Sequence, residues 1–279
     1  MDNIFNKEAK FAEIQENLAK ITNPEDQARA IRSVLIALEI GKDRPEKLAV
    51  VLIHGIRTHA EWQEKIKQEF HADENIKVIP LGYDYLDLIK FWIPFLFRIY
   101  PIRRVEQQLR NIASENKDSK VVVIAHSFGT YIISKILKRS PDIRIERLLL
   151  CGSIIKTNLR WDLVPQRPKL ILNDVGDKDI LPVLAKAGSW GYGASGTFGF
   201  KANEVIDRFH NFGHSDFFDL SHIKIFWTPF IKEAYIAPSK YEENRIKQAY
   251  CIKLLNFLPI KTIFLIFIIW RFDLLSLFL

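Results

Sequence analysis

The sequence predicts an α/β protein whose mostly parallel sheet is flanked by helices. Continuous apolar runs at 48–53 and 121–124 are typical of strands that are buried on both faces, as they are in parallel sheets. These runs alternate along the chain with helix-like segments, which predicts right-handed crossovers between parallel strands. We expect one such domain at residues 45–236, with an N-terminal helical extension at 1–44 and a basic linker plus apolar C-terminal tail at 237–279.

The elements can be placed in order along the chain. Residues 7–40 predict two helices, because apolar residues recur at helical spacing and residues 23–25 form a typical helix start. Residues 86–100 are aromatic and apolar and contain Pro94. Strands are expected at 48–53, 77–81, 121–124, 147–150, 170–172 and 205–209, and helices at about 60–70, 103–116 and 130–139.

The composition excludes several classes of protein. A chain of 279 residues that is 48% hydrophobic can bury a core, so it is not a disordered protein. Forty Lys and Arg against 33 Asp and Glu give a net charge of +7, but these residues are scattered, so we expect no nucleic-acid partner. Two cysteines, Cys151 and Cys251, cannot build a disulfide scaffold or a cysteine-rich zinc site, and they fit a reducing compartment.

The motif that carries chemistry is Ala125-His126-Ser127-Phe128-Gly129. It lies between the apolar strand at 121–124 and the helical pattern that follows. Small residues at 125 and 129 are what a tight turn from strand to helix requires, and such a turn holds its central serine at the carboxyl edge of the sheet beside a helix N-terminus. We expect Ser127 to be a nucleophile; the alternative is a serine that merely caps a helix.

With this motif the chain resembles serine hydrolases of the α/β-hydrolase fold, of the esterase or lipase type. The family has Gly where this chain has Ala125, which is also small. The resemblance implies a triad in the order serine, acid, histidine. The family's Gly-x-x-Asp-x-x-Pro spacing selects Asp179 as the acid, while Asp174 and Asp177 remain alternatives because all three are expected in one loop after the strand at 170–172.

The same resemblance places the catalytic histidine after the last strand, at His214, where Gly213 allows a close approach. His210, at a strand position, is expected to be a packed histidine. The oxyanion hole is expected from two backbone N–H groups, those of Phe128 and of Ile56, which follows His54-Gly55. We expect no cofactor, and no metal, because the remaining histidines show no metal-ligand spacing.

Two segments could select the substrate. Residues 86–104 combine aromatic and basic side chains and suit an acyl chain with an anionic head group, or else form an ordinary core helix with a solvated basic end. Residues 188–200 are rich in glycine and could form a mobile flap near the active site, or a plain irregular connection.

The C-terminal segment 254–279 is mostly apolar, although it contains Pro259 and Lys261. Five Lys and Arg within 232–253 suit a cytoplasmic flank of a membrane segment. The segment is expected to contact a membrane, by spanning or lying on it, or to form a buried C-terminal helix. No basic region followed by an apolar run opens the chain, so we expect a cytoplasmic protein, either free or attached by this tail to the cytoplasmic face of a membrane.

The sequence therefore predicts a serine hydrolase that cleaves carboxylic esters, with lipid or other acyl esters favoured by the apolar segments. Acyltransferases and thioesterases use the same triad and are alternatives. A second alternative is a catalytically silent, membrane-tethered interaction protein on a hydrolase scaffold. The sequence does not predict the oligomeric state.

Overall fold

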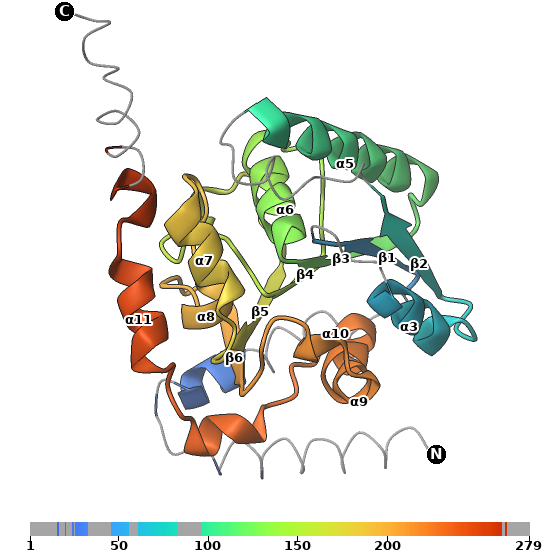
Figure 1. The fold of residues 1–279 in the computed structure, drawn as a ribbon. Coiled ribbons are helices and arrows are strands. Elements are labelled where there is room, and N and C mark those ends of the chain that lie inside the picture. The colour runs from blue at the N-terminus through green and yellow to red at the C-terminus, as the bar shows by residue number, and fades with distance from the viewer. Residues whose placement is uncertain are drawn as a thin grey trace, which may run out of the picture.

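The computed structural model describes residues 46–55, 61–82 and 96–263, together with residues 16, 20, 24, 26–32 and 266. Within these residues a six-stranded sheet has the order β2-β1-β3-β4-β5-β6, and every neighbouring pair is parallel (Figure 1). The strands are β1 (Leu48–Ile53), β2 (Ile76–Leu81), β3 (Lys120–His126), β4 (Arg147–Cys151), β5 (Leu170–Gly176) and β6 (Ile206–His210). The predicted fold class, a mostly parallel sheet flanked by helices, is confirmed.

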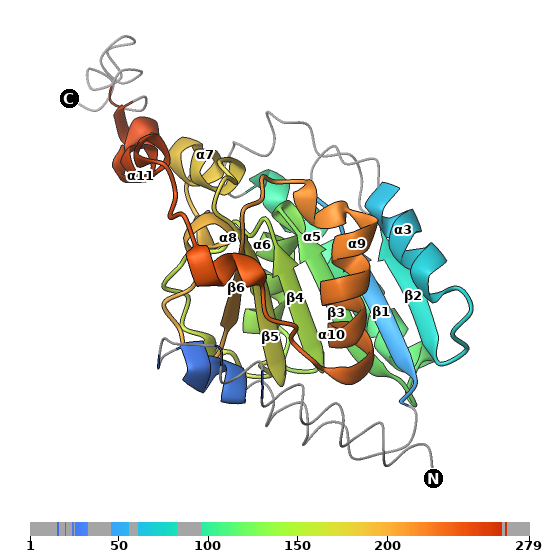
Figure 2. The ribbon, with the colours of Figure 1, turned by 90° about the horizontal axis from the view of Figure 1, so that it is seen from below.

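The central strands are buried on both faces, as their apolar sequences predict. Every residue of β1, β4 and β5 is buried. Helices cover both sides of the sheet (Figure 2), so a side chain of either orientation along these strands meets apolar neighbours. The helices are α3 (Glu61–Phe70), α5 (Leu96–Glu115), α6 (Phe128–Arg139), α7 (Leu181–Gly188), α8 (Ser195–Phe198), α9 (Leu220–His222), α10 (Thr228–Glu233) and α11 (Tyr250–Phe257).

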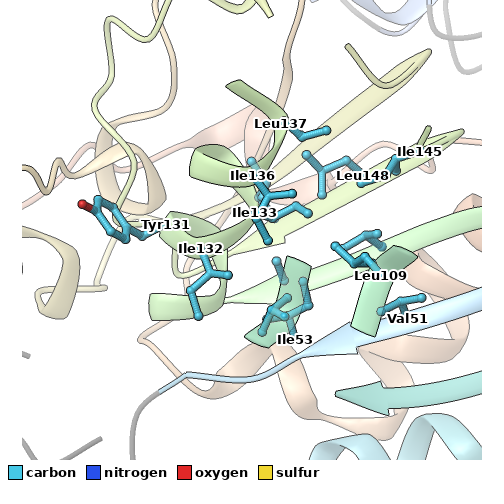
Figure 3. Packing of buried hydrophobic residues seen from close by; sticks show 14 of the residues in the cluster. Val51, Ile53, Leu109, Tyr131, Ile132, Ile133, Ile136, Leu137, Ile145 and Leu148 are labelled. Carbon is cyan, nitrogen blue, oxygen red and sulfur yellow. The ribbon is translucent and has the colours of Figure 1, made fainter. Parts of the chain in front are cut away.

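One face of the sheet packs against α5 and α6. Ile133 and Ile136 of α6 and Leu109 of α5 interdigitate with Val51 and Ile53 of β1 (Figure 3). The opposite face packs against α3 and a helical run formed by α9, a π-helical turn η3 (Ile223–Trp227) and α10. Short 3-10 turns η1 (Trp161–Leu163), η2 (Asp216–Phe218) and η4 (Lys240–Asn244) complete the described elements.

Helix α5 begins earlier than the sequence predicts. We expected a helix from about 103, but the helix begins at Leu96 and contains Pro101. A proline inside a helix removes one backbone hydrogen bond. The buried residues Ile102, Val105 and Leu109 pack into the core and hold the helix in place despite this loss.

The two ends of the chain are described only in part. Residues 26–32 are helical, as expected, while most of the predicted N-terminal helix pair lies outside the described residues. Helix α11 lies beside α7 (Figure 1). Ile252 of α11 shares a small buried cluster with Val183 and Ala194. Among the described residues, no helix combines the length and the apolar character needed to cross a membrane.

Candidate active site

Ser127 occupies a strained turn between β3 and α6. Its backbone φ of 53° lies in the left-handed region, which a residue with a side chain adopts at a cost in energy. The turn is held on both sides: the Ser127 N–H donates to the Cys151 carbonyl at 3.1 Å, and the Thr130 hydroxyl donates to the Ser127 carbonyl at 2.6 Å. Helix α6 begins at Phe128, two residues before the predicted start. The predicted strand-to-helix turn is thus present, with Ser127 at its apex.

The end of β1 lies directly beside this serine. A Cβ atom added to Gly55 would come within 2.8 Å of the Ser127 Cβ and 3.3 Å of its Oγ, so only glycine fits there. One of the two expected oxyanion donors, Phe128, directly follows this serine. Phe128 is the first residue of α6, where backbone N–H groups point out of the helix end and carry partial positive charge. Ile56, the other expected donor, lies outside the described residues.

Asp179 and His214 form a hydrogen-bonded pair at the same edge of the sheet. Asp179 follows β5 and is fully buried, and its Oδ2 lies 2.8 Å from Nδ1 of His214, which follows β6. The Asp179 Oδ1 accepts the backbone N–H of Leu181 at 3.1 Å. Because this carboxylate engages Nδ1, it orients the ring of His214.

The loop after β4 also approaches this histidine. Gly152 has a φ of +54°, and a Cβ there would lie 2.7 Å from His214 Cε1 and 3.2 Å from His126 Cδ2. The His126 and His214 rings are 4.5 Å apart. The turn that holds Ser127 and the pair of Asp179 and His214 therefore converge at the carboxyl ends of β3 to β6.

His126 is a site residue to which the sequence analysis assigned no role. It is 1% exposed, and its Nε2 lies 3.2 Å from the His214 carbonyl oxygen. A carbonyl only accepts, so Nε2 carries the proton and donates it. Burial and the neighbouring His214 hold the pKa of His126 well below its usual value, so the ring is neutral. It thereby ties the residue before the proposed nucleophile to the loop that carries His214.

Asp177, one of the two alternative acids, has different partners. Its carboxylate accepts two hydrogen bonds from Arg245, at 2.7 and 2.8 Å, and one from Gln248 at 2.6 Å. We expected Arg245 to belong to the basic flank of a membrane segment, but it forms an ion pair with the loop that carries Asp179. Arg245 and Gln248, in the predicted basic linker, thus hold the loop that carries Asp177 and Asp179.

Asp174, the other alternative, corrects the predicted loop. Strand β5 extends to Gly176, so Asp174 lies inside the sheet and not in the loop with Asp179. The expected strand at 170–172 was too short because Asn173 and Asp174 interrupt the apolar run. Its buried carboxylate accepts two hydrogen bonds from Arg208, at 2.7 and 2.9 Å, and one from Trp227 at 2.7 Å. His210 and His222 lie at 3.3 and 3.4 Å from the same carboxylate.

We call these five residues the Asp174 cluster. Burial alone would raise the pKa of Asp174, but the charge of Arg208 and the bonds from His210 and His222 bring this pKa well below its usual value. Asp174 and the two histidines hold three potential metal-ligand atoms within 4.8 Å of one another. The fit to a metal is poor, because Arg208 would repel the cation and the carboxylate already faces five donor groups. The cluster is a buried ion-pair network, and His210 is the packed histidine that the sequence predicts.

The glycine-rich segment is packed into the protein and is not an exposed flap. Residues 192–197 are buried, and the N–H groups of Gly193 and Gly196 donate to the carbonyls of Ile154 and Ser153 at 2.8 and 2.7 Å. The Thr197 hydroxyl donates to the Asp179 carbonyl at 2.6 Å. The segment is therefore a packed connection and not a mobile flap. Through Thr197 it supports the loop that carries Asp179.

The other expected substrate segment, residues 86–104, is described only from residue 96. Within it, Arg98 is 3% exposed and donates to the Trp190 carbonyl and the Ser189 hydroxyl, both at 2.6 Å. Its guanidinium also lies 3.9 Å from the centre of the Tyr192 ring. This arginine belongs to the protein interior, so it is not the head-group ligand that the sequence suggests.

No protein-family model and no curated protein sequence matches this chain. Among solved structures, the chain is similar to an α/β serine hydrolase without lid from Xanthomonas campestris, at 12% identity and a TM-score of 0.42, with 66% of this chain and 80% of that chain covered. A cutinase-like protein from Cryptococcus sp. matches at 10% identity and a TM-score of 0.40, covering 66% and 92%. A gene product of Listeria innocua matches at 10% identity and a TM-score of 0.43, with 69% of this chain and 96% of that chain covered. The chain is an α/β protein with a parallel sheet between two helical layers.

Proposed function

We propose that this protein is a serine hydrolase that cleaves carboxylic esters through Ser127, Asp179 and His214. The observation that carries the proposal is the hydrogen bond of 2.8 Å between the buried Asp179 and His214, at the same edge of the sheet as a serine with positive φ at a strand-to-helix turn. A strained serine next to a histidine that is oriented by a buried carboxylate is the arrangement that activates a hydroxyl for attack.

The proposed reaction has two halves. His214 Nε2 takes the hydroxyl proton of Ser127 while Oγ bonds to the ester carbonyl carbon. When the tetrahedral intermediate collapses, the carbon–oxygen bond to the alcohol breaks, and His214 returns the proton to the leaving oxygen. Water then attacks the acyl-enzyme with the same proton transfers, which releases the acid and restores the Ser127 hydroxyl.

Two charges develop in this reaction, one on His214 and one on the substrate oxygen, and groups placed by the fold stabilise both. The carboxylate of Asp179 faces the positive charge that develops on His214, and burial strengthens this attraction. The oxyanion is proposed to be held by the N–H groups of Phe128, at the N-terminus of α6, and of Ile56. The scheme requires no metal or cofactor.

Labelling with a fluorophosphonate probe tests the proposal. The wild type should form a covalent adduct, and Ser127→Ala should not, because the probe reacts only with an activated serine. The folded state of both proteins is checked by circular dichroism. Absence of labelling in folded wild type would contradict the proposal and favour the silent scaffold.

The substrate class needs a second experiment. We propose acyl esters, and a series of p-nitrophenyl esters of increasing acyl length, with a matched thioester, would rank them by kcat/KM. A preference for the thioester, or transfer to an added alcohol in place of water, would shift the proposal to a thioesterase or an acyltransferase. A cytoplasmic location with contact to a membrane through 254–279 is part of the same proposal.

A further inference from the structure

Helices α7 and α11 lie side by side at one end of the molecule (Figure 1 and Figure 2). They carry exposed apolar side chains. Further large apolar side chains lie on the segments next to the two helices. We call the surface that they form the α7–α11 face; its exposed apolar residues are Ile180, Leu181, Leu184, Trp190, Tyr250, Leu254, Phe257, Leu258, Ile260 and Ile263.

The exposure of these side chains follows from how the two helices pack. Ile252, the buried residue of α11, belongs to a small buried cluster with Val183 of α7 and Ala194. Tyr250, Leu254 and Phe257 follow one another at spacings of four and three residues, so they share the outer side of the helix. Tyr250 is 80% and Phe257 81% exposed, which is a large apolar area for a protein to leave in water.

The charges of the α7–α11 face are basic. Residues 244–263 contain Arg245, Lys247, Lys253 and Lys261 and no acidic residue. Arg245 is neutralised by Asp177, while Lys247 is exposed. Lys261 donates to carbonyls at the end of α7 and lies 6.0 Å from the Trp190 ring, so a cation and an amphipathic aromatic side chain meet at this surface.

The basic charge and the apolar area of the α7–α11 face together favour a lipid surface over a second copy of the chain. Two copies of the chain that met through this face by two-fold symmetry would bring like charges together, which disfavours a dimer. A lipid surface with anionic head groups accepts both the apolar side chains and the lysines. The sequence beyond Ile263 continues without an acidic residue as far as Phe272, so the same character persists along the chain.

We propose that the α7–α11 face is the surface by which this protein docks on an anionic lipid bilayer. The face begins immediately after Asp179, at Ile180 and Leu181, so docking would bring the edge of the sheet that carries Ser127 close to the lipid. This step rests on the proposed function and names its substrate class: acyl esters of lipids taken from the surface of the bilayer.

Sedimentation of the full-length protein with vesicles tests the docking surface without any assay of activity. Vesicles of phosphatidylcholine and phosphatidylserine in equal parts should bind the wild type, more weakly at high salt, and vesicles of phosphatidylcholine alone should bind it less. Leu184→Glu and Phe257→Glu should each lower the partition coefficient by about tenfold or more, since each removes a large apolar contact and adds a negative charge. Leu163→Glu is the matched control, because Leu163 is 69% exposed but lies on η1.

The chain also offers its own site for a reporter. Cys251 is exposed on α11 and Cys151 is buried, so a polarity-sensitive thiol dye should label Cys251 alone. Its emission should shift to the blue on anionic vesicles and stay unchanged in the Phe257→Glu variant. Ser127→Ala should bind vesicles like the wild type, so docking and ester hydrolysis can fail separately.

Three results would overturn the proposal. The first is that the wild type does not bind anionic vesicles. The second is that Leu184→Glu and Phe257→Glu bind them undiminished, because the apolar sequence beyond Ile263 would then suffice. The third is a dimer in light scattering that Phe257→Glu dissociates, which would assign the face to a second copy of the chain.

Discussion

Asp179 illustrates how much depends on the place of a single carboxylate. Asp174, Asp177 and Asp179 lie within six residues of sequence, yet only Asp179 is bonded to His214. Asp179→Asn should lower kcat by about four orders of magnitude, because an amide neither fixes the histidine tautomer nor stabilises its charged form. Steady-state kinetics on a p-nitrophenyl ester would measure this. Asp177→Asn is the control, and a comparable loss in that variant would contradict the assignment.

His126 is expected to act through His214 and not on the substrate. Replacing it with Phe keeps a ring but removes the donor to the His214 carbonyl, so kcat should fall by about five- to tenfold while KM stays unchanged. His126→Gln offers an amide N–H and should recover most of the loss. Equal kinetics of the Phe variant and the wild type, or a change confined to KM, would show that this hydrogen bond does not position His214.

At the scale of elements, the Asp174 cluster joins β5, β6 and the helical run from α9 to α10. Arg208 and His210 precede the loop that carries His214, while His222 and Trp227 follow it, so one buried carboxylate holds both ends of this loop. The loop that carries the proposed base is therefore anchored to the strand that leads to the proposed acid.

This arrangement predicts a large effect of breaking the ion pair. Arg208→Met should lower the free energy of unfolding by about 3–5 kcal/mol, because it leaves the Asp174 charge buried without its main partner. The double variant Asp174→Leu with Arg208→Met should recover part of that loss. Urea denaturation of the two single variants and the double variant would measure the coupling. Additive losses would show that the pair contributes no coupling energy.

At the scale of the whole molecule, buried titratable groups make stability depend on pH. Burial raises the pKa of Asp207 to about 7, although hydrogen bonds from Asn173 and Phe200 oppose this. The folded protein then keeps a proton that the unfolded chain, with a pKa of 3.8, has lost. Between about pH 4 and pH 7 this group therefore lowers stability as the pH rises.

Asp207→Asn isolates this contribution. Loss of water contact lowers the pKa values of the half-buried His54 and of the buried His126 and His210, and these groups raise stability as the pH rises. Only a comparison with the variant therefore gives the sign of the contribution of Asp207. The free energy of unfolding of the wild type should fall relative to that of Asp207→Asn as the pH rises from about 4 to 7. A constant difference across this range would mean that the pKa of Asp207 is not raised.

The sequence by itself determined the features that depend on neighbouring residues. The apolar run of β1 and the small residues around Ser127 follow from local periodicity and local sterics, and the structure shows a strand and a strained turn at these places. The resemblance to the family's Gly-x-x-Asp-x-x-Pro pattern singled out Asp179, and this pattern also lies within a few residues.

Tertiary structure decided the features that depend on residues distant in the sequence. It showed that Asp174 continues a strand, because Arg208, His210, His222 and Trp227 arrive from other elements to balance its charge. Residues 188–200, one alternative for which was a mobile flap, pack in the structure against the loop of Asp179, and Arg245 forms an ion pair with Asp177. A charged side chain is placed by the partners that compensate its loss of water, and those partners come together only when the chain has folded.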